Sequence, residues 1–287
     1  MEYQLRNRTL ELTESEAPVY MGIVNVTPDS FSDGGQFFQD DFNPLLAVDA
    51  ALRLEDEGAG IIDIGAESTR PGSTPTPLDE ELRRLEPVLE RLEGRLDVPL
   101  SVDTYKFQTA EAALERGAQI INDVTGGTDP AMREVWAKYQ PGVVVMHHKP
   151  GLLGAFQPEE ANNALQFANT PESGRAPIVA PDSFYRDVIE EVYCELERRL
   201  TLVLEAGLPK EKIALDVGIG FGKTFRDNWS LVENIREFHN LGCPLVVGVS
   251  RKRFLNFSDE KTAEVGRRLI DQGVQILRVH RIPPKNV

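Results

Sequence analysis

Residues 61–72 are Ile61-Ile62-Asp63-Ile64-Gly65-Ala66-Glu67-Ser68-Thr69-Arg70-Pro71-Gly72. A short run rich in Ile ends abruptly in glycine and polar residues, and an amphipathic stretch follows over residues 79–93. This is the strand, loop and helix order of a parallel α/β sheet. The same pattern recurs along the chain, so this stretch predicts the architecture of the rest.

Eight such apolar runs occur, and eight strands are the number that closes a (β/α)8 barrel. Between the runs, apolar residues recur at helical spacing, and several of these helices run into a glycine that can end them. We therefore predict an α/β fold, a (β/α)8 TIM barrel that forms a single domain over residues 1–287. The predicted strands are Tyr20–Val24, Ile61–Ile64, Leu100–Val102, Gln119–Ile121, Val143–Met146, Ile213–Leu215, Leu245–Val249 and Gln275–Val279, and the predicted helices include Asp79–Glu93, Phe107–Arg116, Asp187–Ala206, Asn228–His239 and Ser258–Asp271.

One stretch, residues 150–187, interrupts this alternation. It contains five prolines together with Gly, Asn and Ser, and it shows no sustained period. Such a composition favours a long loop over a helix or a domain boundary. We predict a βα loop insertion over 150–187, after the fifth strand.

The composition excludes several classes of function. Asp and Glu number 46 against 31 Lys and Arg, and the net charge of −15 repels nucleic acid and anionic lipid. No run reaches the roughly 18 apolar residues of a membrane helix. The N-terminus lacks a signal-peptide pattern, and Cys194 and Cys243 are too few for a disulfide framework. We expect a cytoplasmic protein with two buried, inert thiols and no nucleic-acid or membrane partner.

Polar residues follow nearly every predicted strand, at the end of a barrel where chemistry collects. Any one Asp there could instead cap the next helix. Their repetition around one rim favours a pocket with two ends, one for a flat heterocycle rich in donors and one for an anion. The acceptors are Asp103, Asn122 and Asp216, and the cations are Lys252, Arg278 and His280.

Two motifs suggest other functions but lack required residues. Gly222-Lys223-Thr224 resembles the end of a phosphate-binding P-loop, which also requires Gly where this chain has Val217. His147 and His148 suggest zinc, but no Cys or third His has ligand spacing around them. Because neighbours on a strand point to opposite faces, we expect one of these histidines to face the rim and the other the helix layer.

A specific resemblance is carried by two long blocks, Met21-Gly22-Ile23-Val24-Asn25-Val26-Thr27-Pro28-Asp29-Ser30-Phe31-Ser32-Asp33-Gly34-Gly35 and Gly65-Ala66-Glu67-Ser68-Thr69-Arg70-Pro71-Gly72. Shorter blocks support it: Ser101-Val102-Asp103-Thr104, Ile121-Asn122-Asp123, Gly218-Ile219-Gly220-Phe221-Gly222-Lys223, Gly248-Val249-Ser250-Arg251-Lys252 and Arg278-Val279-His280. Over Val19 to His280 the chain resembles the dihydropteroate synthases. The resemblance implies a folate-biosynthesis transferase that joins a pterin-methyl pyrophosphate to para-aminobenzoate.

The resemblance also implies roles for individual residues and one cofactor, Mg²⁺, held by Asn25. Arg278 is expected to stack on the pterin ring, and the loops that carry Asp33 and Arg70 to close over the substrates. The implied pterin contacts are Asp103, Asn122, Asp216, Lys252, Arg278, Met146, Phe221 and Gly248. The implied pyrophosphate contacts are Asn25, Arg278 and His280, the aminobenzoate contacts are Phe31, Thr69, Pro71 and Ser250, and the catalytic residues are Asp33, Arg70 and Lys252.

The chain departs from the family pattern near its C-terminus. Val217 replaces a usual proline, Arg281 replaces a usual Asp, and the stretch between Lys252 and Arg278 is shorter. The sequence stops at Val287, so we expect a truncated last barrel helix. The family's last helices also build its dimer, which leaves a homodimer open. Two alternatives remain: a methyltetrahydrofolate methyltransferase-like enzyme and a non-catalytic pterin-binding homologue.

Overall fold

All eight predicted strands are present and form one parallel sheet that closes on itself. The computed structural model describes residues 1–12, 18–27, 42–68, 74–149, 183–250 and 252–283. The strand order is β8-β7-β6-β5-β4-β3-β10-β9, and a bridge between Leu215 and Leu245 joins the two ends. The strands are β3 (Val19–Asn25), β4 (Ile61–Gly65), β5 (Leu100–Asp103), β6 (Ile120–Asp123), β7 (Gly142–Met146), β8 (Ile213–Asp216), β9 (Val246–Gly248) and β10 (Ile276–Val279).

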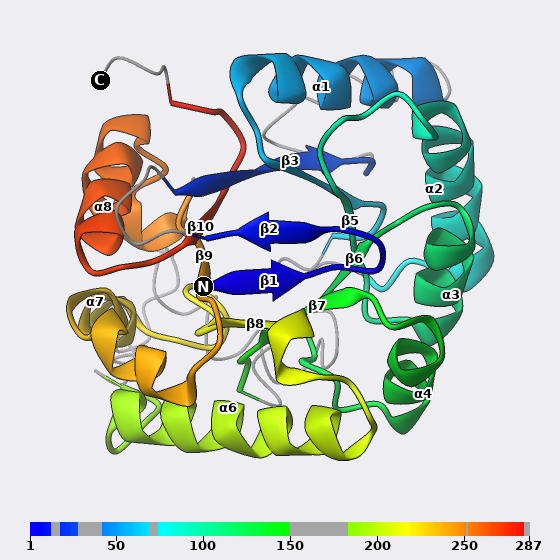
Figure 1. Cartoon of the computed structure of the whole chain (residues 1–287). Helices are drawn as coiled ribbons and strands as arrows, with labels where there is room; N and C mark the ends of the chain where they lie inside the picture. The colour runs from blue at the N-terminus through cyan, green and yellow to red at the C-terminus, as the bar shows by residue number, and fades with distance from the viewer. Residues whose placement is uncertain (13–17, 28–41, 69–73, 150–182, 251, 284–287) are drawn as a thin grey trace, which may run out of the picture.

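Helices surround the strands in chain order, which confirms the predicted TIM barrel (Figure 1). They are α1 (Pro44–Glu57), α2 (Leu78–Leu92), α3 (Phe107–Glu115), α4 (Pro130–Tyr139), α6 (Val188–Glu205), α7 (Phe225–Glu233) and α8 (Asp259–Asp271), with 3-10 turns η2 (Lys210–Lys212), η3 (Ile235–Leu241) and η4 (Arg253–Leu255). None of the helices in the described ranges combines the length and apolar character needed to cross a bilayer. Residues 280–283, the described part after β10, contain no helix.

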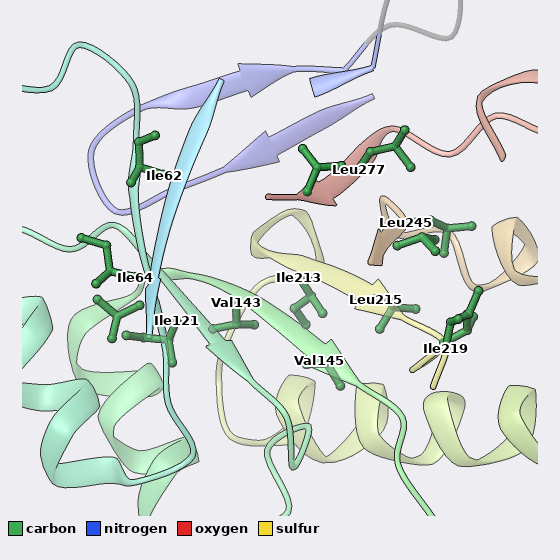
Figure 2. Packing of buried hydrophobic residues seen from close by; sticks show 14 of the residues in the cluster. Ile62, Ile64, Ile121, Val143, Val145, Ile213, Leu215, Ile219, Leu245 and Leu277 are labelled. Atoms are coloured by element: carbon green, nitrogen blue, oxygen red, sulfur yellow. The ribbon is translucent and has the colours of Figure 1, made fainter. Parts of the chain in front are cut away.

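Successive strand residues alternate between two hydrophobic layers. Outward side chains such as Ile62, Ile64 and Val143 pack between the sheet and the helices (Figure 2). Inward side chains such as Ile61 and Ile276 fill the lower part of the barrel as a second cluster. The same alternation points later residues of each strand into the barrel, where polar side chains replace the apolar ones.

The end of the barrel opposite the strands' carboxyl ends is closed by a hairpin that we did not predict. Its strands are β1 (Glu2–Gln4) and β2 (Thr9–Glu11), paired antiparallel. Tyr3 and Leu5 are buried in the cluster that fills the lower barrel, and the hairpin crosses that end of the barrel in Figure 1. The polar rim is therefore at the other end, as in TIM-barrel enzymes generally.

One helix differs from its prediction by more than two residues at an end. The segment predicted as a single helix over 228–239 begins earlier, at Phe225, because Thr224 and Asp227 form a capping box. The α-helix ends at Glu233, and Asn234 (φ −118°) precedes the 3-10 helix η3. The turn brings Ile235 and Phe238 into the core. Burial of these two side chains therefore decides where the α-helix ends, although the spacing of apolar residues would allow it to continue.

Candidate active site

The inward residues at the carboxyl ends of the strands form one polar rim. In the sheet register Asn25 pairs with Gly65, Gly65 with Asp103, and Asp103 with Asn122. On the other side Met146 pairs with Asp216, and Gly248 with Arg278. These pairings bring together the predicted rim residues Asn25, Asp103, Asn122, Met146, Asp216, Gly248 and Arg278.

Arg278 lies inside the barrel between two carboxylates. Its Nε donates to Asp63 Oδ2 at 2.7 Å, and its Nη2 donates to Asp103 Oδ2 at 2.7 Å. Asn122 Nδ2 donates to the same Asp63 oxygen at 3.1 Å. Two charge-assisted bonds fix the plane of the guanidinium, which is the property required for a residue that stacks on a flat ring.

Asp63 is the residue of this network that sequence reasoning missed. It is fully buried in the middle of β4, and among the described residues its Oδ1 has no hydrogen-bond partner. The sequence does carry a signal for Asp63, because it interrupts the apolar run Ile61-Ile62-Asp63-Ile64. A carboxylate is seldom buried without a cation, so an Asp in a buried strand indicates a cationic partner. Asp63 lies in the middle of β4, apart from the strand ends on which the predicted rim is based.

Burial controls the protonation of Asp103. Desolvation raises the pKa of its carboxyl to about 7, with further increases from Asp63, Asp123 and Glu81, whereas Arg278 lowers it. Asp103 therefore changes charge near neutral pH. A carboxyl that titrates in a cleft is typical of a functional site.

Asp216 is held by the loop that follows β8. Its Oδ1 accepts from Gly218 N at 2.7 Å, and burial raises its pKa, opposed by Lys252, Lys223 and Arg278. Gly218 has φ +69°, and a Cβ at this position would lie 1.7 Å from the carbonyl oxygen of His147. Only glycine fits this turn, which brings the loop against the end of β7.

The apolar wall of the rim comes from the end of β7 and the segments that follow β5, β6 and β8. Val124 and Met146 are buried together, and Phe221 and Tyr105 pack against them. Lys252 Nζ lies 4.4 Å from the centre of the Phe221 ring. The predicted pterin contacts Met146, Phe221 and Lys252 therefore lie in one region, beside Asp216.

Ser250 links the ends of β9 and β10, the two strands that follow β8 around the barrel. Its Oγ lies 3.0 Å from Nδ1 of His280 and accepts from the His280 backbone N–H at 3.3 Å. Ser250 and His280 were predicted to contact different substrates. Their hydrogen bond places the two predicted contact residues side by side.

Five predicted site residues fall in parts of the chain that the structure does not describe. Phe31, Asp33, Thr69, Arg70 and Pro71 lie outside the described residues, as does most of the predicted insertion over 150–187. Their roles stay predictions from the sequence.

The residues of the two rejected motifs contact one another instead of forming separate sites. Lys223 Nζ lies 2.9 Å from His147 Nδ1, and Arg199 of α6 contacts His148. His147 therefore contacts the loop after β8, whereas His148 contacts both Arg199 of α6 and, through Nδ1, the carbonyl oxygen of Val124. Cys243 is buried, whereas Cys194 is exposed on α6, so its predicted burial is wrong: it lies on the outer face of that helix.

No group of three or more His, Cys, Asp or Glu within the described residues could hold a metal ion. Asn25, at the end of β3, supplies an amide oxygen, a hard ligand of the kind that Mg²⁺ accepts. Mg²⁺ commonly binds through one or two protein ligands and completes its shell with water and substrate phosphates. The donor set therefore fits a substrate-borne Mg²⁺ and not a closed protein cage.

The chain is similar to known proteins over the residues that form the barrel and its rim. Residues 21–280 match the family model described as pterin binding enzyme. The dihydropteroate synthase of Bacillus subtilis is 38% identical over 280 residues, 94% of this chain and 86% of that protein. A probable bifunctional folylpolyglutamate synthase/dihydropteroate synthase of Haloferax volcanii is 39% identical over 94% of this chain, which spans 30% of that longer protein.

Solved structures agree with the sequence relatives. A dihydropteroate synthase of Xanthomonas albilineans with 4-aminobenzoic acid has a TM-score of 0.80 and 36% identity, over 98% of this chain and 93% of that one. The same organism's enzyme in complex with 7,8-dihydropteroate has a TM-score of 0.76 and 33% identity, over 98% and 94%. The chain thus belongs to the pterin binding enzymes and, among them, to the dihydropteroate synthases, which are transferases.

Proposed function

We propose that this chain condenses 6-hydroxymethyl-7,8-dihydropterin pyrophosphate with para-aminobenzoate, giving 7,8-dihydropteroate and pyrophosphate. The observation that carries the proposal is the position of Asp103, Asn122 and Asp216 on one rim with Arg278 and Lys252. Related structures carry 4-aminobenzoic acid and 7,8-dihydropteroate, a substrate and the product of this reaction.

The acidic side of the rim suits the pterin. Its 2-amino and ring N–H groups are donors, and ionised Asp103 and Asp216 accept. The Asn122 amide can both accept and donate hydrogen bonds, which matches an edge of the pterin ring that carries both donors and acceptors. Arg278, fixed by Asp63 and Asp103, would stack on the ring, and Met146 and Phe221 would cover its apolar face.

The cationic side suits the leaving group. The bond between the pterin methylene carbon and the pyrophosphate oxygen breaks, and its electron pair leaves with pyrophosphate. The arylamine nitrogen then attacks the methylene carbon and loses a proton. Lys252, Arg278 and His280 would stabilise the departing anion, while the carboxylates stabilise positive charge on the pterin. We infer that Asp33 and Arg70 contribute to this step, Phe31, Thr69, Pro71 and Ser250 to aminobenzoate binding, and Gly248 to the pterin pocket.

Mg²⁺ bound by Asn25 and the substrate phosphates would neutralise charge that develops on the leaving group. The role of Asn25 is then to orient the pyrophosphate end of the substrate. Asn25→Ala is expected to raise the Mg²⁺ concentration needed for half-maximal activity about tenfold, because few protein contacts hold this ion. A magnesium titration of initial rates measures this, and full parent activity in excess chelator would contradict it.

The proposed reaction is tested directly by following dihydropteroate formation with the purified chain and by complementation of a strain lacking the synthase. Growth without folate end-products would exclude a non-catalytic homologue. Binding of the pterin without product would support that homologue instead. Transfer of a methyl group from methyltetrahydrofolate would support the methyltransferase alternative.

Asp216→Asn is expected to weaken pterin binding about 10- to 150-fold, because a charge-assisted bond to a buried partner is worth about 1.5–3 kcal/mol. Aminobenzoate binding should change little. Calorimetry with a pterin analogue and with para-aminobenzoate separates the two. Parent-like pterin affinity would show that Asp216 does not line the pterin pocket.

Pterin affinity is also expected to depend on pH. Since burial raises the pKa of Asp103 to about 7, its carboxyl becomes a charged, acceptor-only group only as pH rises through that value. The affinity should therefore increase between about pH 6 and pH 8. Asp103→Asn removes this titration and controls for ionisation of the ligand. The same pH dependence in Asp103→Asn would assign it to another group.

A further inference from the structure

Lys223 has no role in the function proposed above, yet it is a buried cation beside the pterin side of the rim. Its ammonium donates to the carbonyl oxygens of Gly218 at 2.9 Å and Phe221 at 3.2 Å. The third neighbour is His147 Nδ1, at 2.9 Å. Three acceptors for three N–H groups match a protonated amine.

His147 is suited to accept this bond. Burial lowers the pKa of its ring, and the cations Lys223 and Arg199 lower it further. The ring is therefore neutral, and its Nδ1 can offer a lone pair to the ammonium. The His147 backbone N–H also donates to the carbonyl oxygen of Asp216 at 2.8 Å. The end of β7 is thereby bonded to β8 and to the loop after it.

Lys223 affects Asp216 through both position and charge. Lys223 binds the carbonyl oxygens of Gly218 and Phe221. Gly218 N–H donates to the Asp216 carboxylate, and the Phe221 side chain lines the apolar wall. The positive charges that face Asp216 are Lys252, Lys223 and Arg278. The groups that face Lys223 are Asp216 of β8, Arg199 of α6, Asp227 of α7, Lys252 after β9, and His147.

We propose that Lys223 is a positioning residue for pterin binding: it holds the 217–223 loop, whose Gly218 N–H donates to the Asp216 carboxylate, against the end of β7. This rests on the proposed function, in which Asp216 accepts from the pterin. Desolvation lowers the pKa of Lys223 to about 7, so below neutral pH its charge is present to oppose protonation of Asp216. Without that charge, Asp216 should be protonated at a higher pH.

Two substitutions separate the contributions. Lys223→Met removes the charge and the donors, whereas Lys223→Gln removes the charge but keeps an N–H donor group. Lys212→Met is the matched control, since Lys212 Nζ donates to the carbonyl oxygens of Leu5 and Gln140 at 2.8 and 2.9 Å at the hairpin end of the barrel. All three variants lose a lysine that is bound to backbone carbonyl oxygens, but only the two Lys223 variants lose it beside Asp216.

The experiment measures thermal stability and the affinity for a pterin analogue between pH 4.5 and 7. Lys223→Met should weaken pterin binding about tenfold or more at pH 7. In both Lys223 variants the acid loss of affinity should move to higher pH than in the parent. Asp103 is the same in every variant, so a difference between them reports on Asp216. Lys212→Met should lose stability while keeping the parent's affinity and pH profile.

The outcomes are separable. If Lys223→Gln and Lys223→Met keep the parent's affinity and pH profile and lose only stability, the positioning role is overturned. If Lys223→Met does not fold, the pH profile of Lys223→Gln decides. If the parent itself neither binds the pterin nor forms dihydropteroate, the proposed function fails, which is a different result from parent-like variants.

Discussion

Asp63→Ala is expected to lower the free energy of unfolding by about 3–5 kcal/mol, because it leaves a largely buried guanidinium without one of its two carboxylate partners. Asp63 is fully buried, and its Oδ2 accepts from both Arg278 and Asn122. Pterin binding should also fall, since Arg278 loses the bond that fixes its plane. Chemical denaturation and calorimetry with a pterin analogue measure the two effects.

An exposed ion pair provides the control for Asp63. Glu264 and Arg268 of α8 are 2.7 Å apart, with about half of each side chain exposed. Glu264→Ala should change stability by less than about 1 kcal/mol, because water screens such pairs. Equal losses in Asp63→Ala and Glu264→Ala would mean that the buried network contributes no more than a surface pair.

Gly218→Ala is expected to cost about 2–5 kcal/mol of stability and to weaken pterin binding at least tenfold. The added Cβ would overlap the His147 carbonyl oxygen, so the loop must move away from β7, in addition to the cost of a left-handed conformation. The bond from Gly218 N to Asp216 would move with it. Thermal denaturation and pterin titration test both parts.

Gly207→Ala isolates the conformational cost. Gly207 has φ +94°, but no described atom lies within 4 Å of a Cβ built there. Its loss should be about 1 kcal/mol, with unchanged pterin affinity. If the two alanine variants behave alike, contact with His147 is not what requires glycine at position 218.

The sequence predicted the barrel because its signal is repeated. Each strand is a short β-branched run between polar loops, so a boundary error of one residue, as at Asn25 or Asp216, does not change the topology. The hairpin β1–β2 has strands of three residues each, too short to show a period. It forms because Tyr3 and Leu5 fill the open end of the barrel, a long-range cause that local patterns do not contain.

The candidate site was predictable to the extent that its residues end strands. Asp103 and Asp216 end their strands, Asn122 is the last residue but one of β6, and the register joins them to one rim. Asp63 and Lys223 were missed for a physical reason: their importance comes from partners far along the chain. Arg278 is 215 residues from Asp63, and His147 is 76 residues from Lys223. Only the closed barrel brings these pairs together.

The N-terminal hairpin constrains the order in which the chain folds. Leu5 O accepts from Lys212, 207 residues away, and Arg6 donates to Leu114 O across 108 residues. The apolar cluster that receives Tyr3 includes Ile276 of the last strand. The surface on which the hairpin docks is therefore complete only when β10 is in place. Closure of this end of the barrel should therefore be a late step of folding, because the contacts that hold the hairpin are between residues far apart in the sequence.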